Sequence, residues 1–363
     1  MRIAQIAPLA ESVPPKLYGG TERVVSWLTE ELVALGHEVT LFASGDSVTT
    51  GTLVPIVPKA IRLSRPRPDP FPAYAAQLDA IARAASDFDV LHSHIDWLHL
   101  PLLGQLGVPH LTTLHNRLDT PNLPALIRRF PSAQLISISD HHRVPLPTAN
   151  WLGTVYHGMP PATLEPSYAT GRYLVFLGRL TREKGPEAAI HIARATGMRL
   201  RMAAKIPRSE TRYYKERLQP MIDGEQIKLV GELNDKAKGD LLRGAAALLF
   251  PIDWPEPFGL VMIEAMACGT PVIAFRRGSV PEVIDEGQTG FVVDDEDQAI
   301  AAVKRIGALD RRRVRASFER RFTARRMAED YVRHYRAVLQ DETRRAPESV
   351  CRPDGRQQRR LAP

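Results

Sequence analysis

The length and composition of the chain indicate a globular protein with two domains. It has 363 residues, of which 44% are hydrophobic and 25% are charged, whereas one domain usually spans roughly 100–200 residues. It contains no apolar run of about 18 residues, so we expect no transmembrane helix. Its first residues, MRIAQIAP, lack the basic, long apolar and small-residue regions of a signal peptide, which predicts a cytoplasmic protein.

The formal net charge of +7 is concentrated near the C-terminus. Residues 311–363 contain 16 Arg and no Lys against 7 Asp and Glu, so the rest of the chain is close to neutral. These arginines are interleaved with Ala and Pro and lack the aromatic residues on which a single-strand binder stacks bases. We therefore expect a solvated helix face and a basic, disordered tail at 341–363, with no nucleic-acid partner. Contact with a membrane is left open but not indicated.

The first half of the chain has the pattern of parallel βα units. Short runs rich in β-branched residues or Leu alternate with loops and with segments of helical periodicity. The helical segment 22–38 contains Gly36 near its end, and this glycine suits a helix C-cap. The strands predicted for this sheet are 2–8, 38–44, 89–94, 110–115 and 134–139.

A second series of strands follows the segment 156–171, which is rich in Pro, Gly, Ser and Thr and is the predicted linker. Domains are therefore predicted at 1–160 and 161–321. A C-terminal helix at 322–340 is expected to return to the first domain, because apolar and aromatic residues recur in it at helical spacing. The residues with this spacing are Met327, Tyr331 and Tyr335. The strands predicted for the second sheet are 172–179, 198–204, 227–233, 247–252 and 270–275.

Open parallel sheets bind ligands beyond the C-terminal ends of their strands, and this rule sorts the candidate residues. The polar residues and loops at these ends are the PPKLYGGTE loop (14–22), His94 with Asp96, His115, Ser139 with Asp140, Arg179 with Lys184, and the segment 253–264. Asp87 and Asp89 form a D-x-D pair of the kind that binds metal ions. They enter their strand at its N-terminal end, so we expect them to point away from the ligand.

Two glutamates in PIDWPEPFGLVMIEAMACGTPVIA (251–274) are spaced for the hydroxyls of a sugar nucleotide. Glu256 lies in a loop bracketed by prolines, Pro257 suits an early position in the following helix, and Glu264 falls about two turns further on. By themselves, two glutamates are more simply interpreted as a helix cap and a solvated side chain. The backbone N–H groups free to meet an anion or a sugar hydroxyl at this helix end are those of Phe258, Gly259 and Leu260.

Three further groups at strand ends suit a sugar diphosphate. Arg179 offers a planar fork of donors and Lys184 a compact ammonium, although either can equally be a surface charge. Gly19 and Gly20 leave room for a phosphate to reach their backbone N–H groups, although two glycines also make a simple turn. His115 can bind a sugar hydroxyl, and its alternative is a buried structural histidine.

These segments together resemble glycosyltransferase family 4, a large family of retaining glycosyltransferases. EPFGLVMIEAMACGTPVIA is similar to its E-x7-E segment, and FLGRLTREKG (176–185) to its strand-end Arg and Lys pair. YGGTE (18–22) resembles its N-terminal glycine loop, and TLHN (113–116) the segment that bears its active-site histidine. The resemblance covers the chain up to about residue 340. It implies an α/β fold of the GT-B type, with two facing Rossmann-like domains and a central cleft.

The resemblance also implies a role for each matched residue. These roles are donor-sugar contact for Glu256 and His115, ribose contact for Glu264, and phosphate contact for Arg179, Lys184 and Gly20. Without a well-placed carboxylate nucleophile, transfer with retention would follow a same-face route in which the leaving phosphate helps to deprotonate the acceptor hydroxyl. The nucleotide sugar is a substrate, and no further cofactor is implied.

No metal ion is expected in this site. The D-x-D pair is misplaced, and His92, His94 and His99 lack a convincing set of carboxylate or thiolate partners. Cys268 and Cys351 are far apart in the sequence and are expected to be free thiols.

The preferred donor is UDP-glucose, with GDP-mannose second, and the acceptor can be a small molecule, a glycan or a lipid-linked sugar. Alternatives on the same fold are a nucleotide-sugar epimerase or a phosphorylase, and a nucleotide-sugar-binding protein without catalytic activity. A dinucleotide oxidoreductase is disfavoured, because no G-x-G-x-x-G follows the first strand. One departure from the family is His157-Gly158-Met159-Pro160, where relatives often have an Asn-Gly-x-Asp turn.

Overall fold

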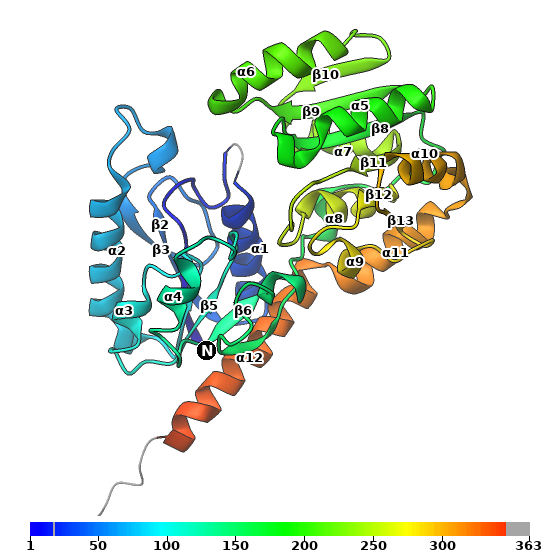
Figure 1. Cartoon of the computed structure of the whole chain (residues 1–363). Coiled ribbons are helices and arrows are strands. Elements are labelled where there is room, and N and C mark those ends of the chain that lie inside the picture. Colours follow the sequence, from blue (N-terminus) through cyan, green and yellow to red (C-terminus); the bar gives the residue numbers. More distant parts are fainter. Residues whose placement is uncertain (17–18, 346–363) are drawn as a thin grey trace, which may run out of the picture.

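The computed structural model of the chain consists of two lobes, each built on a parallel sheet flanked by helices (Figure 1). It describes residues 1–16 and 19–345, with side chains described up to residue 340. Two facing Rossmann-like units of this kind make up the GT-B fold, so the predicted fold class is confirmed. Among the helices of the described residues, none combines the length and the apolar character needed to cross a membrane.

Seven parallel strands form the first sheet, in the order β3-β2-β1-β4-β5-β6-β7. β1 (Arg2–Ile6) lies inside the sheet between β2 and β4, where Ile3 pairs with Val39 of β2 on one side and with Val90 of β4 on the other. Its alternate residues face opposite sides of the sheet, and Ile3 and Ile6 belong to separate hydrophobic clusters. The other strands are β2 (Glu38–Ser44), β3 (Thr52–Val57), β4 (Val90–Ser93), β5 (His110–Thr113), β6 (Leu135–Ser137) and β7 (Trp151–Thr154).

The second sheet has six parallel strands in the equivalent order, β10-β9-β8-β11-β12-β13. β8 (Tyr173–Arg179) takes the place of β1 and pairs with β9 and β11, so that Arg179 lies at its C-terminal end. The other strands are β9 (Leu200–Lys205), β10 (Ile227–Gly231), β11 (Ala245–Phe250), β12 (Val272–Phe275) and β13 (Gly290–Val293).

All the predicted strands are present, and three that were not predicted complete the sheets. β3, β7 and β13 each lie at the edge of a sheet. They give a weak signal because β3 contains Pro55, β7 contains Gly153 and β13 has four residues. Strands with long apolar runs were therefore easier to recognise than these three edge strands.

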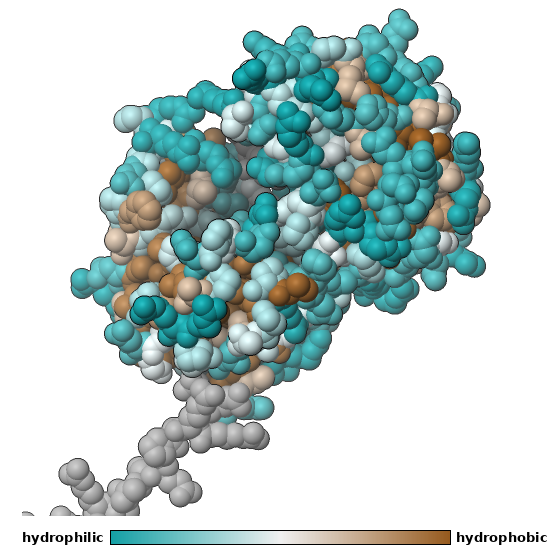
Figure 2. Space-filling view, in the orientation of Figure 1, coloured by the Kyte–Doolittle hydropathy of each residue, from teal (hydrophilic) through white to brown (hydrophobic). Residues whose placement is uncertain are grey.

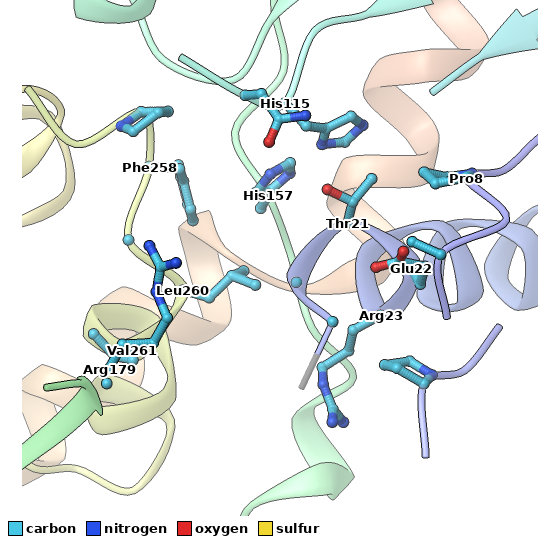
Figure 3. A pocket seen from close by; sticks show the side chains of 18 of the residues that line it. Pro8, Thr21, Glu22, Arg23, His115, His157, Arg179, Phe258, Leu260 and Val261 are labelled. Atoms are coloured by element: carbon cyan, nitrogen blue, oxygen red, sulfur yellow. The ribbon is translucent and has the colours of Figure 1, made fainter. Parts of the chain in front are cut away.

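Helices connect the strands, and α1 (Gly20–Ala34) begins at the glycine loop, with its first residues at the pocket between the lobes (Figure 3). Gly36 follows it in the left-handed conformation, at φ 84°, as expected for a helix end. The remaining helices are α2 (Pro70–Ala84), α3 (Leu100–Leu103), α4 (Leu123–Ile127), α5 (Pro186–Ala195), α6 (Thr211–Tyr213), α7 (Asp235–Arg243), α8 (Leu260–Ala267), α9 (Val280–Val283), α10 (Glu296–Arg305), α11 (Arg311–Arg321) and α12 (Ala324–Arg345).

The last helix, α12, leaves the second lobe and runs back along the first (Figure 1). Tyr331 and Tyr335 are completely buried there, in the same cluster as Ile3 of β1. At the crossing, a Cβ atom on Gly158 would lie 2.2 Å from the carbonyl oxygen of Thr323, so a larger residue would push the two segments apart. α12 continues past the predicted helix end at residue 340. Residues 346–363, where we expect a basic tail, lie outside the described residues.

Two arginines of the basic C-terminal stretch are buried, which corrects the expectation that this stretch forms only a solvated helix face. Arg311 and Arg315 are 8% and 7% exposed. The guanidinium of Arg311 donates to groups of the linker and of the second sheet, and burial lowers its pKa. Its acceptors are the carbonyls of Ser167 (2.8 Å), Arg243 (3.0 Å) and Ala245 (2.7 Å) and the hydroxyl of Thr270 (2.8 Å).

We expect Arg311→Lys to destabilise the protein by about 2–4 kcal/mol, because an ammonium cannot satisfy four acceptors spread in a plane and leaves buried carbonyls without donors. Urea unfolding followed by tryptophan fluorescence measures the change. Arg313→Lys is the matched control, since the Arg313 side chain is 80% exposed and should change stability by less than about 0.5 kcal/mol. Equal stability of the two variants would contradict the anchoring role of Arg311.

Candidate active site

A cleft of about 1160 Å³ lies between the C-terminal edges of the two sheets, and all ten predicted site residues line it. Figure 2 shows it as a hollow between the lobes with a largely hydrophilic rim. The ten residues are Gly19, Gly20 and His115 from the first lobe and Arg179, Lys184, Glu256, Phe258, Gly259, Leu260 and Glu264 from the second. Asp87 and Asp89 are not among the lining residues, and Asp89 binds Arg2 at the opposite end of the sheet.

The glycine loop brings the start of α1 close to the second lobe. Gly19 is the N-cap of α1, and a Cβ atom on it would lie 2.9 Å from both Pro15 and the Glu22 carboxylate. Gly20 faces Leu260 of α8, and a Cβ atom on it would lie 3.7 Å from that side chain. Figure 3 shows Thr21 and Glu22 on one side of the pocket and Leu260 and Arg179 on the other. Two helix N-termini therefore approach each other across the cleft, and both favour an anion.

Glu256 forms an ion pair with Lys184, so it does not cap a helix. α8 begins only at Leu260, and Gly259 before it has a left-handed backbone at φ 78°. Pro257 therefore lies in the loop, and the prediction that it occupies an early position of the helix is wrong. The Lys184 and Glu256 side chains are only 13% and 11% exposed. The ammonium of Lys184 also lies 4.7 Å from the ring centre of Trp254. This geometry holds a carboxylate and a cation together at the wall of the cleft.

Glu264 is buried and paired, so the alternative of a solvated side chain is wrong. Lys238 of α7 donates to its carboxylate at 2.6 Å and lies 3.1 Å from Asp235. Burial opposes the charge on Lys238, but Glu264 and Asp235 outweigh it and raise the lysine pKa. Asp235 is bound in turn by Arg23 of α1 at 2.6 Å. A chain of ion pairs therefore runs from Glu264 across the cleft to the first lobe.

His115 is buried among other histidines at the base of the cleft. Its Nε2 lies 2.9 Å from Nδ1 of His94, and its ring stacks on His157 with ring centres 5.3 Å apart. Burial, with a smaller contribution from His142, lowers its pKa to about 3. It is therefore neutral near pH 7, and a neutral imidazole can form hydrogen bonds without carrying a charge.

Several lining residues that bind predicted ones were not included in the predicted site, and Lys238 and Asp96 are two of them. Lys238 sits on a polar helix with no motif, and only the fold brings it to Glu264. Asp96 was noted at a strand end but not included in the site. It adopts a left-handed backbone at φ 52°, and its carboxylate accepts from the backbone N–H of His115 at 3.3 Å. Burial raises its pKa. A positive φ is uncommon for an aspartate and marks Asp96 as a residue of interest, but this signal is visible only in the structure and not in the sequence.

Chemically, the cleft combines cations and N–H groups for a diphosphate with carboxylates and a neutral imidazole for hydroxyls. In the described residues, no three His, Cys, Asp or Glu side chains are grouped so that they could hold a metal ion. Cys268 is a buried free thiol, whereas Cys351 lies outside the described residues.

Comparison with known families agrees with this geometry. Residues 165–321 match the family model Glycosyl transferases group 1, and residues 18–178 match the model Glycosyltransferase Family 4. The chain belongs to the group 1 / family 4 glycosyltransferases. It is therefore a glycosyltransferase whose sugar donor is a nucleotide sugar.

The similar proteins include sequence relatives and solved structures. The chain is 26% identical to D-inositol 3-phosphate glycosyltransferase of Corynebacterium efficiens, over 88% of this chain and 86% of that protein. It is 28% identical to the protein of that name from Pseudarthrobacter chlorophenolicus, with the match spanning 58% of this chain and 60% of that protein. AviGT4, a glycosyltransferase involved in avilamycin A biosynthesis, superimposes with a TM-score of 0.69 at 26% identity, covering 93% and 98% of the two chains. Anabaena Alr3699/HepE, solved with UDP-glucose, has the same fold, with a TM-score of 0.71 at 16% identity over 93% and 100% of the chains.

We expect Lys184→Ala to weaken UDP binding by roughly tenfold or more and uridine binding by less than about twofold. The substitution removes a cation that we expect to face the phosphates, and it leaves Glu256 without its ion-pair partner. Calorimetric titration with UDP and with uridine measures both losses. Lys236→Ala, on α7 but outside the lining, is the control. Equal losses for the two ligands would mean that Lys184 acts only through the structure.

Proposed function

We propose that this glycosyltransferase moves a hexose from a nucleotide sugar to an acceptor hydroxyl with retention of anomeric configuration, and that UDP-glucose is preferred to GDP-mannose as donor. One observation carries the proposal: residues from both lobes that match the family's donor-binding motifs line a single cleft. The preference for UDP-glucose is supported by the complex of HepE, a protein of the same fold.

The diphosphate of the donor lies, in this proposal, between the lobes. Arg179 and Lys184 contact it from the second lobe, and the N–H groups at the start of α1, including Gly20, contact it from the first. The free N–H groups and the dipole at a helix N-terminus both favour the negative charge that grows on the leaving phosphate. Closely spaced cations and helix ends then stabilise the transition state more than the bound substrate.

The two glutamates hold the rest of the donor. Glu264 accepts hydrogen bonds from the ribose hydroxyls, while Lys238 balances its charge. Glu256 and His115 contact hydroxyls of the sugar from opposite lobes. Because Lys184 touches Glu256, one cation links the sugar end of the site to the phosphate end.

The chemistry follows a same-face route. The bond between the anomeric carbon and the phosphate oxygen breaks, and the diphosphate keeps the electron pair. The acceptor oxygen forms a bond to the anomeric carbon on the same face, and its proton passes to the leaving phosphate. A neutral His115 takes no part in that proton transfer, and Glu256, held by Lys184, contacts hydroxyls and does not attack the anomeric carbon.

Assays of the products separate this proposal from an epimerase and from a binding protein. The enzyme should hydrolyse UDP-glucose slowly without acceptor and release glucose and UDP, because water can replace the acceptor. An epimerase would change the sugar and leave the nucleotide sugar intact. Binding of the donor without turnover in any acceptor screen would favour a non-catalytic protein.

We expect Glu256→Gln to lower kcat by at least about 100-fold, because an ionised group aimed at developing charge in a shielded site contributes several kcal/mol. The fold should be retained, since the amide oxygen can still accept from Lys184. Hydrolysis and transfer rates at saturating donor measure the effect. Asp253→Asn, three residues earlier and 78% exposed, should leave the rate unchanged. More than a third of wild-type turnover in Glu256→Gln would remove Glu256 from the site.

Closure of the lobes on the donor is a further part of the proposal. The domains predicted at 1–160 and 161–321 would move about the linker 156–171 and the start of α12, and the Arg23–Asp235 ion pair would join them across the cleft. Small-angle scattering should give a smaller radius of gyration with saturating UDP-glucose than without it. Identical profiles at demonstrated saturation would contradict closure.

A further inference from the structure

A group of polar side chains is buried behind His115, away from the proposed donor contacts. Gln5 of β1, His92 of β4, His94 just after β4 and Thr113 of β5 are at most 1% exposed, as are Tyr331 and Tyr335 of α12. Isolated polar groups in such a place would cost folding free energy. Here they bind each other in one continuous chain that ends at His115.

The chain of hydrogen bonds crosses from α12 to the cleft. Nε2 of Gln5 lies 3.1 Å from the hydroxyl of Tyr335, and Oε1 of Gln5 lies 2.8 Å from Nε2 of His94. Nδ1 of His94 lies 2.9 Å from Nε2 of His115. On the other side, Tyr335 lies 2.7 Å from Nδ1 of His92, whose Nε2 lies 2.8 Å from the hydroxyl of Thr113.

The Gln5 amide sets the direction of this chain. Its oxygen Oε1 faces Nε2 of His94 at 2.8 Å, and its nitrogen Nε2 faces the Tyr335 hydroxyl at 3.1 Å. Having accepted from Gln5, the Tyr335 hydroxyl donates its own hydrogen to Nδ1 of His92 at 2.7 Å. The amide therefore presents an acceptor to His94 and a donor to α12.

This orientation determines the tautomers of both histidines. Because Oε1 of Gln5 only accepts, Nε2 of His94 carries the proton and its Nδ1 is an acceptor. Nε2 of His115 then carries the proton and donates to His94. Nδ1 of His115 is left as a bare acceptor. It is buried and has no hydrogen-bond partner among the described residues, although His115 lines the cleft.

We propose that Gln5 and His94 are positioning residues that hold His115 in its Nε2–H tautomer, so that Nδ1 accepts a hydrogen bond from one hydroxyl of the donor sugar. The inference rests on the proposed function for the identity of the ligand, but the tautomer itself does not depend on it. Tyr335 extends the arrangement to α12, because its hydroxyl accepts from Gln5 and so keeps the amide in place.

The surroundings keep this chain uncharged across the working pH range. His115 is faced by His94, His142 and His157, and its backbone N–H by the carboxylate of Asp96. Burial is the largest cause that lowers the pKa of each of these histidines, and it raises the pKa of Asp96. Since the histidine pKa values are depressed, the neutral forms dominate above those values and no proton enters the chain near neutral pH.

The tautomer can be read directly in the full-length protein by long-range ¹H–¹⁵N correlation with labelled histidine, because protonated and bare ring nitrogens differ greatly in ¹⁵N shift. Comparison with His115→Gln assigns the signals. We expect His115 to show a bare Nδ1 and a protonated Nε2, with or without UDP-glucose. A protonated Nδ1 in the wild-type protein would overturn the proposal whatever the substrate is.

The catalytic consequence is tested with Gln5→Met, which keeps the volume and removes the amide. It should lower kcat for UDP-glucose by about fivefold, the effect of one neutral hydrogen bond, and give His115 a mixture of tautomers. The matched control is His99→Leu, since His99 is equally buried but binds only Ser93 and Thr112, outside this chain. It should change neither the tautomer nor kcat by more than about twofold.

Singly deoxygenated UDP-glucose analogues separate positioning from general damage. The wild-type enzyme should turn over one of these analogues more slowly than UDP-glucose. In Gln5→Met most of that rate difference should disappear for the same analogue and for no other, because the substitution and the missing hydroxyl affect the same interaction. Equal loss for all analogues, or an unchanged pattern, would overturn the positioning role. Absence of turnover with every nucleotide sugar would instead refute the proposed function and leave the tautomer measurement valid.

Discussion

The packing of α12 on the first sheet fixes how the two halves of the cleft face each other. The helix starts in the second lobe and buries Tyr331 and Tyr335 completely against the first. At the crossing, Arg326 donates to the carbonyls of Tyr156 and His157, so the linker is tied to the helix that runs beside it. Two chain segments therefore cross between the lobes at one place, and opening of the cleft on the opposite side would have to break the Arg23–Asp235 ion pair.

Charge pairing is the second constraint on the site. Lys184 with Glu256, Lys238 with Glu264 and Arg23 with Asp235 bring each carboxylate a cation, so these walls carry little net charge. In the proposed complex, a diphosphate would therefore depend on the ends of α1 and α8 for additional positive potential. The same pairing makes the contacts interdependent, because removing one partner leaves a partly buried charge behind.

The sequence predicted those parts of the fold and site whose signals are local. Long apolar runs marked the inner strands, and the ends of those strands placed Arg179 and His115 correctly at one edge, because parallel strands share an orientation. Features that depend on distant segments were not predictable. Lys238 meets Glu264 only after α7 and α8 pack together, and His115 is bound by His94, which links it to β1 and α12 through Gln5. Arg311 looked solvated because three of its four acceptors are backbone carbonyls, which leave no trace in composition.

The central claim is that a nucleotide-sugar donor is held by both lobes at once. A crystal structure with UDP, or with the nucleoside diphosphate that binds most tightly in calorimetry, tests it directly. We expect the phosphates within hydrogen-bond distance of Lys184 or Arg179 and of the backbone N–H groups at the start of α1, with the ribose against Glu264. A nucleotide bound outside the cleft, or held by one lobe with the start of α1 and His115 turned away, would contradict it.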